Sequence, residues 1–153
     1  MKKVIHVIPS IAEEGSGPSY SVRRLSESLN EDGINNLLVA LKFDENQKQS
    51  QTLKFFPISF WPTALGISSG LKKWLTLQGK LKKLALIHNH GMWQFNGLYP
   101  SWAGKKNSIP VISSPRGTLS KWSFNSGAYA KKFFWPLLQK PALENITCFH
   151  ATS

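Results

Sequence analysis

The sequence predicts an α/β fold, a doubly wound parallel sheet with helices on both faces. Near-continuous apolar runs at residues 3–8, 84–89 and 109–113 are typical of strands that are buried on both faces. Stretches with helical spacing of apolar residues separate these runs, and an alternation of strands and helices favours a parallel sheet. The chain has 153 residues, of which 41% are hydrophobic, so it is long enough and apolar enough for one globular core.

The first unit is a strand at 3–8, a loop at 9–17 and a helix. Ser16 or Gly17 can cap this helix, Pro18 suits its first turn, and Gly33 is a helix stop. Strands are expected at 36–41 and 53–58, joined by the polar loop 44–52. Residues 60–69 have no clear pattern.

The second half repeats the alternation of helices and strands. The apolar spacing from Leu71 to Leu84 or Ala85 predicts a helix that runs into the strand at 84–89. The remaining elements are a helix at 97–105, a strand at 109–113, a helix at 128–139 interrupted by Pro136, a short helix from 141 and a strand at 147–150.

Charge is distributed very unevenly along the chain. The net charge is +11, and no Asp or Glu occurs from residue 46 to 143, a span with 14 Lys and Arg. Such a field is drawn to anionic lipid headgroups, phosphorylated substrates or nucleic acid, although a single lysine cluster can also be a solvated face. Six Trp and nine Phe are many for one core, so several are expected on an interface or a membrane-facing surface.

The single cysteine limits the chemistry. Cys148 excludes an intrachain disulfide and a four-cysteine zinc site, and it favours a reducing compartment. Its apolar neighbours predict a core position rather than a nucleophile. No Ser-His-Asp set is readable, so hydrolase chemistry is disfavoured. The start of the chain is read as a strand rather than a signal peptide, and no apolar run is long enough for a transmembrane helix.

Polar or glycine-rich loops follow three of the strands. Residues 13–19, EEGSGPS, precede a helix, and Gly15 and Gly17 let the backbone approach a phosphate or a sugar hydroxyl there. The loop lacks the dinucleotide fingerprint and the P-loop signature, so a plain turn and a ligand loop remain equally open. All three loops should lie at one edge of the sheet, where open α/β sheets bind ligands.

The second loop, HNHGMW at 88–93, has two histidines. His88 is expected to be structural, whereas His90, at the strand exit beside Gly91, is expected to face a ligand. A metal is not expected, because no carboxylate or cysteine lies nearby in the sequence.

The third loop places Arg116 directly after a strand and Pro115. An arginine there suits bidentate binding of phosphate or carboxylate. The alternative, a surface arginine paired with a carboxylate, is weakened by the scarcity of acids. Lys121, Lys131 and Lys132 could extend an anion site or face lipid.

These loops together resemble the N-terminal half of family 4 glycosyltransferases, which are retaining enzymes of the GT-B fold. The matching segments are IHVIPSIAEEGSGPSYSVRRLSESLNEDG, the H-x-H-G-x-W element at 88–93, SPRGTLSKW at 114–122 and AKKFFWPLLQKPALENITCFHATS at 130–153. The resemblance covers nearly the whole chain in order, with a loose match at 44–85. Arg116 stands where many members have histidine.

The resemblance implies a Rossmann-like domain, one half of a GT-B fold, with residues 1–153 as the acceptor-binding N-terminal domain and the C-terminal nucleotide-sugar domain absent. It assigns His90 and Arg116 to the cleft, near the transferred sugar or the acceptor, as catalytic residues. Its substrate-binding residues are Gly15, Ser16 and Gly17, near the donor diphosphate, with Gly91, Trp93, Gly117 and Lys121. No metal and no cofactor are expected beyond the nucleotide-sugar donor as substrate.

The expected function is sugar transfer from a nucleotide-sugar to a saccharide acceptor that is often lipid-linked, in bacterial surface polysaccharide synthesis. The chain alone is expected to be inactive, and to be cytoplasmic or peripheral at the inner face of the cytoplasmic membrane. Helix 71–84, with its lysines, could lie on anionic lipid. Two alternatives remain, a basic module for RNA or another polyanion, although no RNA-binding consensus appears, and a non-catalytic partner subunit of a split transferase.

Overall fold

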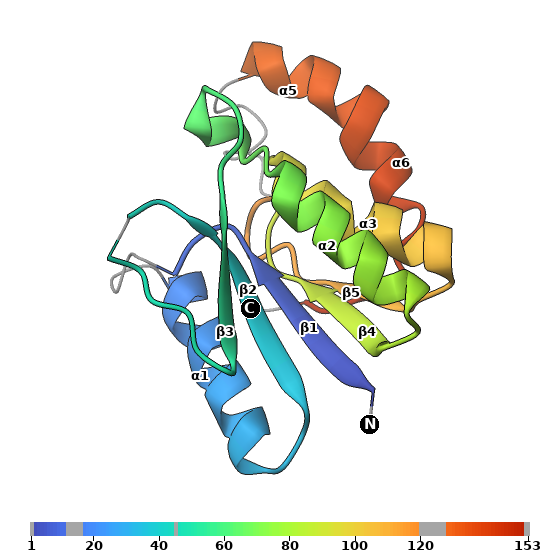
Figure 1. The fold of residues 1–153 in the computed structure, drawn as a ribbon. Helices are drawn as coiled ribbons and strands as arrows, with labels where there is room; N and C mark the ends of the chain where they lie inside the picture. The colour runs from blue at the N-terminus through green and yellow to red at the C-terminus, as the bar shows by residue number, and fades with distance from the viewer. Residues whose placement is uncertain (1, 12–16, 45, 120–127, 152–153) are drawn as a thin grey trace.

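Six parallel strands form one sheet in the computed structural model, which describes residues 2–11, 17–44, 46–119 and 128–151. The strand order is β3-β2-β1-β4-β5-β6, and every neighbouring pair runs parallel (Figure 1). The strands are β1 (Lys3–Ile8), β2 (Asn36–Lys42), β3 (Leu53–Pro57), β4 (Leu84–Asn89), β5 (Val111–Ser113) and β6 (Cys148–Phe149). The chain begins in the middle of the sheet and builds outward in both directions, which confirms the predicted α/β class.

Helices cover both faces of this sheet (Figure 1). The helical segments are α1 (Gly17–Glu31), the short 3₁₀ turn η1 (Thr63–Leu65), α2 (Ser69–Lys80), α3 (Phe95–Asn107), α5 (Ala128–Phe134), the π-helical turn η2 (Trp135–Gln139) and α6 (Lys140–Leu143). Helix α1 packs on one face, while α2 and α3 pack together on the other. The Ser101 hydroxyl of α3 donates to the Ala142 carbonyl of α6 at 2.6 Å, which holds α6 on the α3 side.

Two apolar cores follow from the alternation of side chains along β1 and β2. On the α1 side, Ile8 packs with Val22 of the helix and with Leu38 and Ala40. The other side holds the larger cluster, which consists of Ile5, Val7, Leu37, Val39, Leu41, Phe56, Leu71, Leu75, Leu84, Ile87, Tyr99 and Ala103. Since β1 and β2 contribute to both clusters, they are buried on both faces, as their continuous apolar sequences predict.

Helix α2 is shorter than its apolar spacing predicts. The prediction extended it to residue 84 or 85, but the helix ends at Lys80, and Lys82 lies in the left-handed region with φ of 52°. Leu84 then starts β4 and is buried in the sheet, which is why it fits both patterns. At the other end, the Ser68 hydroxyl caps the helix by accepting from the Leu71 N–H at 3.3 Å.

The predicted core position of Cys148 is wrong. Cys148 and Phe149 are both exposed, because β6 is the edge strand and pairs only with β5. The predicted interruption at Pro136 is confirmed in a specific form, since Pro136 lies in η2 and not in a regular α-helix.

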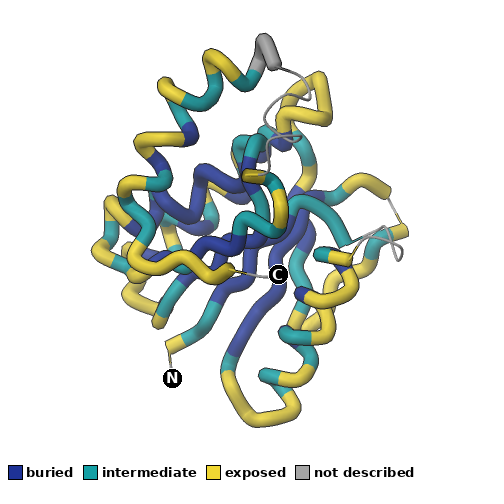
Figure 2. The backbone as a smooth tube through the Cα atoms, turned by 180° about the vertical axis from the view of Figure 1, so that it is seen from behind, coloured by how far each residue is buried: buried dark blue, intermediate teal, exposed yellow. Residues whose placement is uncertain are grey.

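Several large apolar side chains lie at the surface, as their number in the sequence suggested. Trp61 is 88% exposed, and Phe60, Phe133 and Leu137 are each exposed by more than half. Buried residues fill the strands and most of α3, while the outer turns of the other helices are exposed (Figure 2). Within the described part of the chain, none of the helices is both long enough and apolar enough to cross a bilayer.

Two helical glycines offer a matched test of this packing. A Cβ at Gly104 of α3 would collide with the Val111 side chain and lie 2.9 Å from the Ile109 carbonyl oxygen, whereas a Cβ at Gly70 of α2 would make an ordinary 3.5 Å contact with Phe56. We predict that Gly104→Ala lowers the free energy of unfolding by about 1–3 kcal/mol, since the rigid strand must move. Gly70→Ala should leave it unchanged or raise it by about 0.5–1 kcal/mol. Urea unfolding of both variants measures the difference, and equal stabilities would contradict the packing of α3 on β5.

Candidate functional site

The three strand exits meet at one edge of the sheet and form a pocket. The pocket has a volume of about 270 Å³, and we call it the strand-exit pocket. Its lining comes from the end of β1, the start of α1, the exit of β4 and the exit of β5: Ile8, Pro9, Ser10, Pro18, Ser19, His90, Gly91, Met92, Gln94, Pro115, Arg116 and Thr118. The convergence predicted from the sequence is therefore confirmed for the described parts of the three loops.

Close approach of two strand exits sets the floor of this pocket. The His90 N–H donates to the Val7 carbonyl at 2.8 Å, so the pairing of β1 with β4 continues past the end of β4. Gly91 follows with φ of 157°, and a Cβ there would lie 3.1 Å from the Pro9 ring. A glycine at position 91 therefore lets the β4 exit pass against the β1 exit.

Arg116 joins the β5 exit to the start of α1. Its Nη1 donates to the Ser21 hydroxyl at 2.8 Å, although 95 residues separate the two in sequence. The Nε atom is buried without a hydrogen-bond partner among the described residues. Burial lowers the pKa of Arg116, but an arginine remains charged at any physiological pH. Arg116 therefore brings a positive charge with unused donor capacity to the pocket.

The backbone conformation of the β5 exit aims this side chain. Arg116 lies in the left-handed region with φ of 49°, and Gly117 follows with φ of 75°. For a non-glycine residue this conformation costs about 1 kcal/mol or more, so the tertiary contacts must hold it in place. The link to Ser21 is one such contact.

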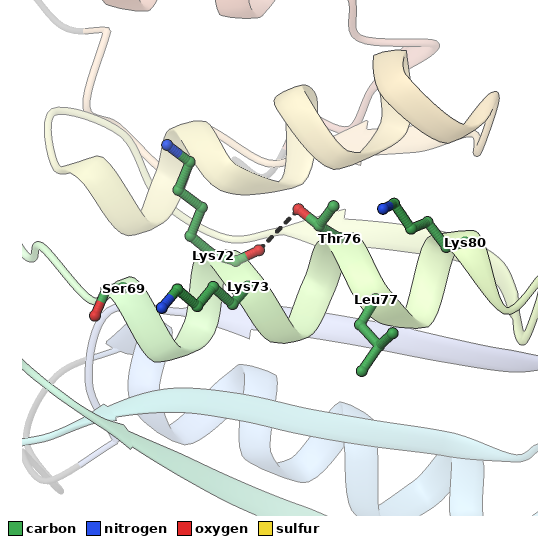
Figure 3. A pocket seen from close by; sticks show the side chains of 6 residues that line it. All are labelled: Ser69, Lys72, Lys73, Thr76, Leu77 and Lys80. Carbon is green, nitrogen blue, oxygen red and sulfur yellow. Dashed lines mark hydrogen bonds between the residues drawn. The ribbon is translucent and has the colours of Figure 1, made fainter.

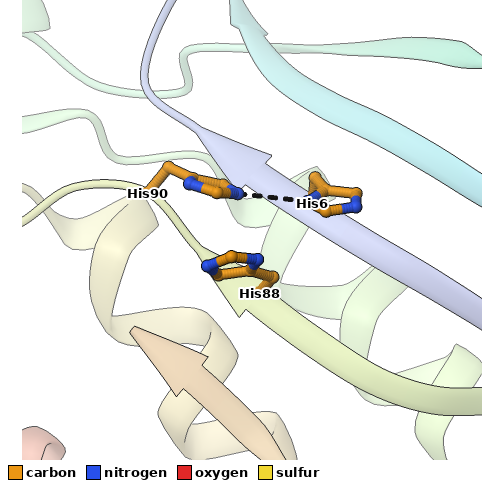
Figure 4. Close-up of side chains that lie close together, drawn as sticks. All are labelled: His6, His88 and His90. Carbon is orange, nitrogen blue, oxygen red and sulfur yellow. Dashed lines mark hydrogen bonds between the residues drawn. The ribbon is translucent and has the colours of Figure 1, made fainter. Parts of the chain in front are cut away.

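Three buried histidines lie beside the pocket (Figure 4). His6 of β1 and His88 of β4 are register partners, and His90 is two residues further along, so all three share one face of the sheet. His6 Nδ1 and His90 Nε2 are 3.1 Å apart and share a hydrogen bond, and the ring centroids of His88 and His90 are 3.9 Å apart. His90 lines the strand-exit pocket.

Burial keeps these imidazoles uncharged. It lowers the pKa of His6 to about 4, and burial together with the charge of His6 lowers the pKa of His88 to about 4. The pKa of His90 is lowered furthest, by burial and then by the charges of His88 and His6. At neutral pH each ring can donate or accept a hydrogen bond but carries no positive charge.

A hydrogen-bonded chain links His88 to the surface. His88 Nε2 lies 2.8 Å from the Ser114 hydroxyl, which lies 3.0 Å from Nδ1 of the exposed His150. His88 is thus hydrogen-bonded within the fold, and its predicted structural role stays a prediction.

Trp93 braces the loops instead of lining the strand-exit pocket. Its Nε1–H donates to the Thr118 carbonyl at 2.8 Å, its backbone N–H donates to Gln139 Oε1 at 3.1 Å, and the Lys131 ammonium lies 5.0 Å from its ring centroid. Its predicted contact with substrate stays a prediction. Of the other predicted residues, Gly17 begins α1 and Gly117 follows Arg116, while Gly15, Ser16 and Lys121 lie outside the described residues.

A second hollow lies along helix α2 (Figure 3). It measures about 420 Å³ and is lined by Ser69, Lys72, Lys73, Thr76, Leu77 and Lys80. We call it the lysine groove. The lysine groove is larger than the strand-exit pocket, but its titratable side chains are all lysines and all lie on α2. It therefore offers positive charge, without groups from several elements that meet at one point.

Solved structures with this fold are known, although no protein-family model and no curated protein matches the chain. The putative UDP-N-acetylglucosamine 2-epimerase of Listeria monocytogenes aligns with 99% of this chain and 39% of its own, with a TM-score of 0.65 and 12% identity. MnaA of S. aureus, solved with UDP, aligns with 99% of this chain and 39% of its own (TM-score 0.60, 14% identity). MurG of Acinetobacter baumannii aligns with 99% and 41% (TM-score 0.59, 10% identity).

The fold is that of a GT-B-type N-terminal domain. Identities this low show the fold alone, and the chain spans about two fifths of the length of the structures that it matches. Membership of family 4 stays a prediction from the sequence motifs.

The buried histidines should make the domain sensitive to acid. The unfolded chain takes up protons on histidine as the pH falls through about 6.5, whereas folded His6 and His88 do so only near 4. Their contribution is fully present above pH 6.5 and is lost as the pH falls toward 4, since the unfolded state binds more protons there. We expect a loss of about 2 kcal/mol per buried histidine between pH 7 and 5.

Urea unfolding at pH 7 and 5, with EDTA present to exclude metal, measures this loss. A stability that is equal at both pH values would show that the three rings are not buried as described.

Proposed function

We propose that this chain is the acceptor-side domain of a sugar-nucleotide-dependent glycosyltransferase. The observation that carries the proposal is the convergence of Arg116, the start of α1 and His90 on one pocket at the carboxyl edge of the sheet. Two of the similar structures support a nucleotide-sugar ligand through their names, one as a UDP-N-acetylglucosamine 2-epimerase and one as a complex with UDP. The sequence motifs favour a retaining enzyme of bacterial surface polysaccharide synthesis.

The positive side of the pocket would face the leaving diphosphate. The first turn of α1 has backbone N–H groups without an intrahelical partner and the positive end of the helix dipole, and Arg116 adds a guanidinium within hydrogen-bonding distance of the same helix. Donors fixed before the reaction stabilise the charge that develops on the leaving group. This arrangement supplies positive charge from the protein itself, so this step does not depend on a metal.

His90 would act as a neutral hydrogen-bonding group. Its Nδ1 is buried and has no hydrogen-bond partner among the described residues, while its Nε2 is engaged with His6. Because its pKa lies far below neutrality, it suits the orientation of a hydroxyl on the acceptor or on the transferred sugar. A C-terminal domain would bind the nucleotide-sugar. Without it, this chain would not catalyse sugar transfer.

Arg116→Ala tests the role of the guanidinium. In a chain that carries a family-type C-terminal half, we expect turnover to fall about 100-fold, the usual effect of removing one preorganised donor. Arg23→Ala is the matched control, since Arg23 lies exposed on α1 and pairs with Glu27. Thermal unfolding should be alike in the two variants. Undiminished turnover of folded Arg116→Ala would refute the role of this residue.

Calorimetric titration with a UDP-sugar tests the domain assignment. We expect binding only when the C-terminal half is supplied, because the residues that bind the donor would lie in that half. Firm binding by this chain alone would show that the chain is itself a nucleotide-binding domain, and the function would then have to be sought in the loop at 13–19.

The lysine groove supports a peripheral position on an anionic membrane. Helix α2 buries Leu71 and Leu75 and exposes Lys72, Lys73 and Lys80, with Leu77 half exposed between them (Figure 3). Lysines beside exposed apolar side chains suit the headgroup region of a bilayer. An RNA partner is the alternative that the same charges allow.

Vesicle sedimentation tests the membrane position. The triple variant Lys72→Gln/Lys73→Gln/Lys80→Gln should lose most binding to phosphatidylglycerol vesicles, because each lysine contributes about 1 kcal/mol to the free energy of membrane binding. The control Arg23→Gln/Arg24→Gln/Lys48→Gln removes the same charge, two of its positions being on the opposite face, and should retain binding. Equal losses in both variants would indicate a diffuse effect of net charge, and retention on RNA but not on vesicles would favour the polyanion alternative.

A further inference from the structure

The three buried histidines form a set of nitrogen ligands that the sequence did not reveal. The sequence places only His88 and His90 near each other, and two imidazoles without a carboxylate do not predict a metal. The sheet adds His6, which is the register partner of His88 on the neighbouring strand. One ligand nitrogen from each ring lies within 4.8 Å of the other two (Figure 4).

We propose that His6, His88 and His90 bind one transition-metal ion of the Zn²⁺ type. Three imidazoles without an oxygen ligand suit Zn²⁺ and its neighbours Co²⁺ and Ni²⁺, and they exclude Mg²⁺ and Ca²⁺, which require oxygen ligands. This inference does not rest on the proposed function, which assigns the metal no step.

Distances within the cluster are close to those of a metal site. Two nitrogens on a tetrahedral Zn²⁺ with bonds of 2.0–2.1 Å are about 3.4 Å apart. His6 Nδ1 and His90 Nε2 are 3.1 Å apart, so this pair is almost in place. One nitrogen from each of the three rings lies within 4.8 Å of the others, against about 3.4 Å for two nitrogens on one tetrahedral ion.

The protons on these rings are free to make way for a metal. In the hydrogen bond between His6 and His90, one of the two facing nitrogens carries a proton. The far nitrogens, His6 Nε2 and His90 Nδ1, have no hydrogen-bond partner among the described residues, so their surroundings do not fix the tautomer. If both protons sit on the far nitrogens, both facing nitrogens present lone pairs to the ion.

Ser114 fixes the orientation of the third ring. His88 Nε2 lies 2.8 Å from the Ser114 hydroxyl, which can accept its proton while donating its own to His150 Nδ1 at 3.0 Å. Such a hydrogen bond behind a ligand histidine holds its tautomer and leaves Nδ1 for the metal. A fourth position would face the strand-exit pocket, which His90 lines, and could hold water or an anion.

Binding of Zn²⁺ and Co²⁺ to the metal-stripped chain tests the site. We expect one ion per chain by calorimetry and the intense visible absorption of tetrahedral Co²⁺. His6→Gln and His90→Gln should each weaken binding at least 100-fold, while Cys148→Ser, which removes an exposed surface ligand, should not. Loss of binding in Cys148→Ser instead, or no binding by the folded wild-type chain, would overturn the proposal.

X-ray absorption of the Zn²⁺-loaded wild-type chain needs no variant that might fail to fold. A first shell of nitrogen and oxygen with outer-shell scattering from three imidazoles would support the triad. A sulfur ligand would assign the ion to Cys148 at the edge of the sheet and would overturn it.

Discussion

The parallel pairing of β1 with β4 in the middle of the sheet is the constraint on which the site depends. This one ladder places His6 opposite His88, and its continuation through the His90 N–H and the Val7 carbonyl carries the register beyond the strand ends. Gly91 then lies against Pro9, where a Cβ would lie 3.1 Å from the Pro9 ring and any other residue would be strained. A slip of one residue in this register would turn the histidines to the other face and separate the walls of the strand-exit pocket.

The loops at the strand exits are held by contacts that span the chain. Arg116 reaches Ser21 across 95 residues, and Trp93 bonds to both Thr118 and Gln139. Trp93 and Arg116 both have positive φ, a conformation that local sequence does not favour in either residue. The geometry of the pocket is therefore a product of tertiary structure, and a change at a bracing residue such as Trp93 can alter it without touching the pocket.

Sequence patterns predicted the sheet well because its central strands are buried on both faces. Residues 3–8 and 84–89 were located to the residue, since a continuous apolar run bounded by polar residues has few other interpretations. Two predictions were wrong, each at a place where one sequence pattern is compatible with two structures. Leu84 fits the spacing of α2 yet belongs to β4, and Cys148 is apolar in context yet lies on an edge strand.

The site was predictable only in part, for a related reason. A strand exit is a local feature, so His90, Gly91 and Arg116 could be singled out from their neighbours in sequence. The contribution of His6 depends on which strand lies beside β4, and no local pattern contains that information. The bond between Arg116 and Ser21 is non-local in the same sense.

The charge distribution finally decides what the histidines can do. A histidine that works as a general base at neutral pH usually has a carboxylate that supports its imidazolium form. Here residues 46–143 contain no acid. Burial is the largest cause that keeps the pKa of His88 and His90 low, and Arg116 and any protonated neighbouring histidine oppose protonation further. The rings are therefore kept as neutral lone-pair donors beside a fixed guanidinium. That combination suits the binding of hydroxyls, anions or a metal ion, and it disfavours a hydrolytic triad.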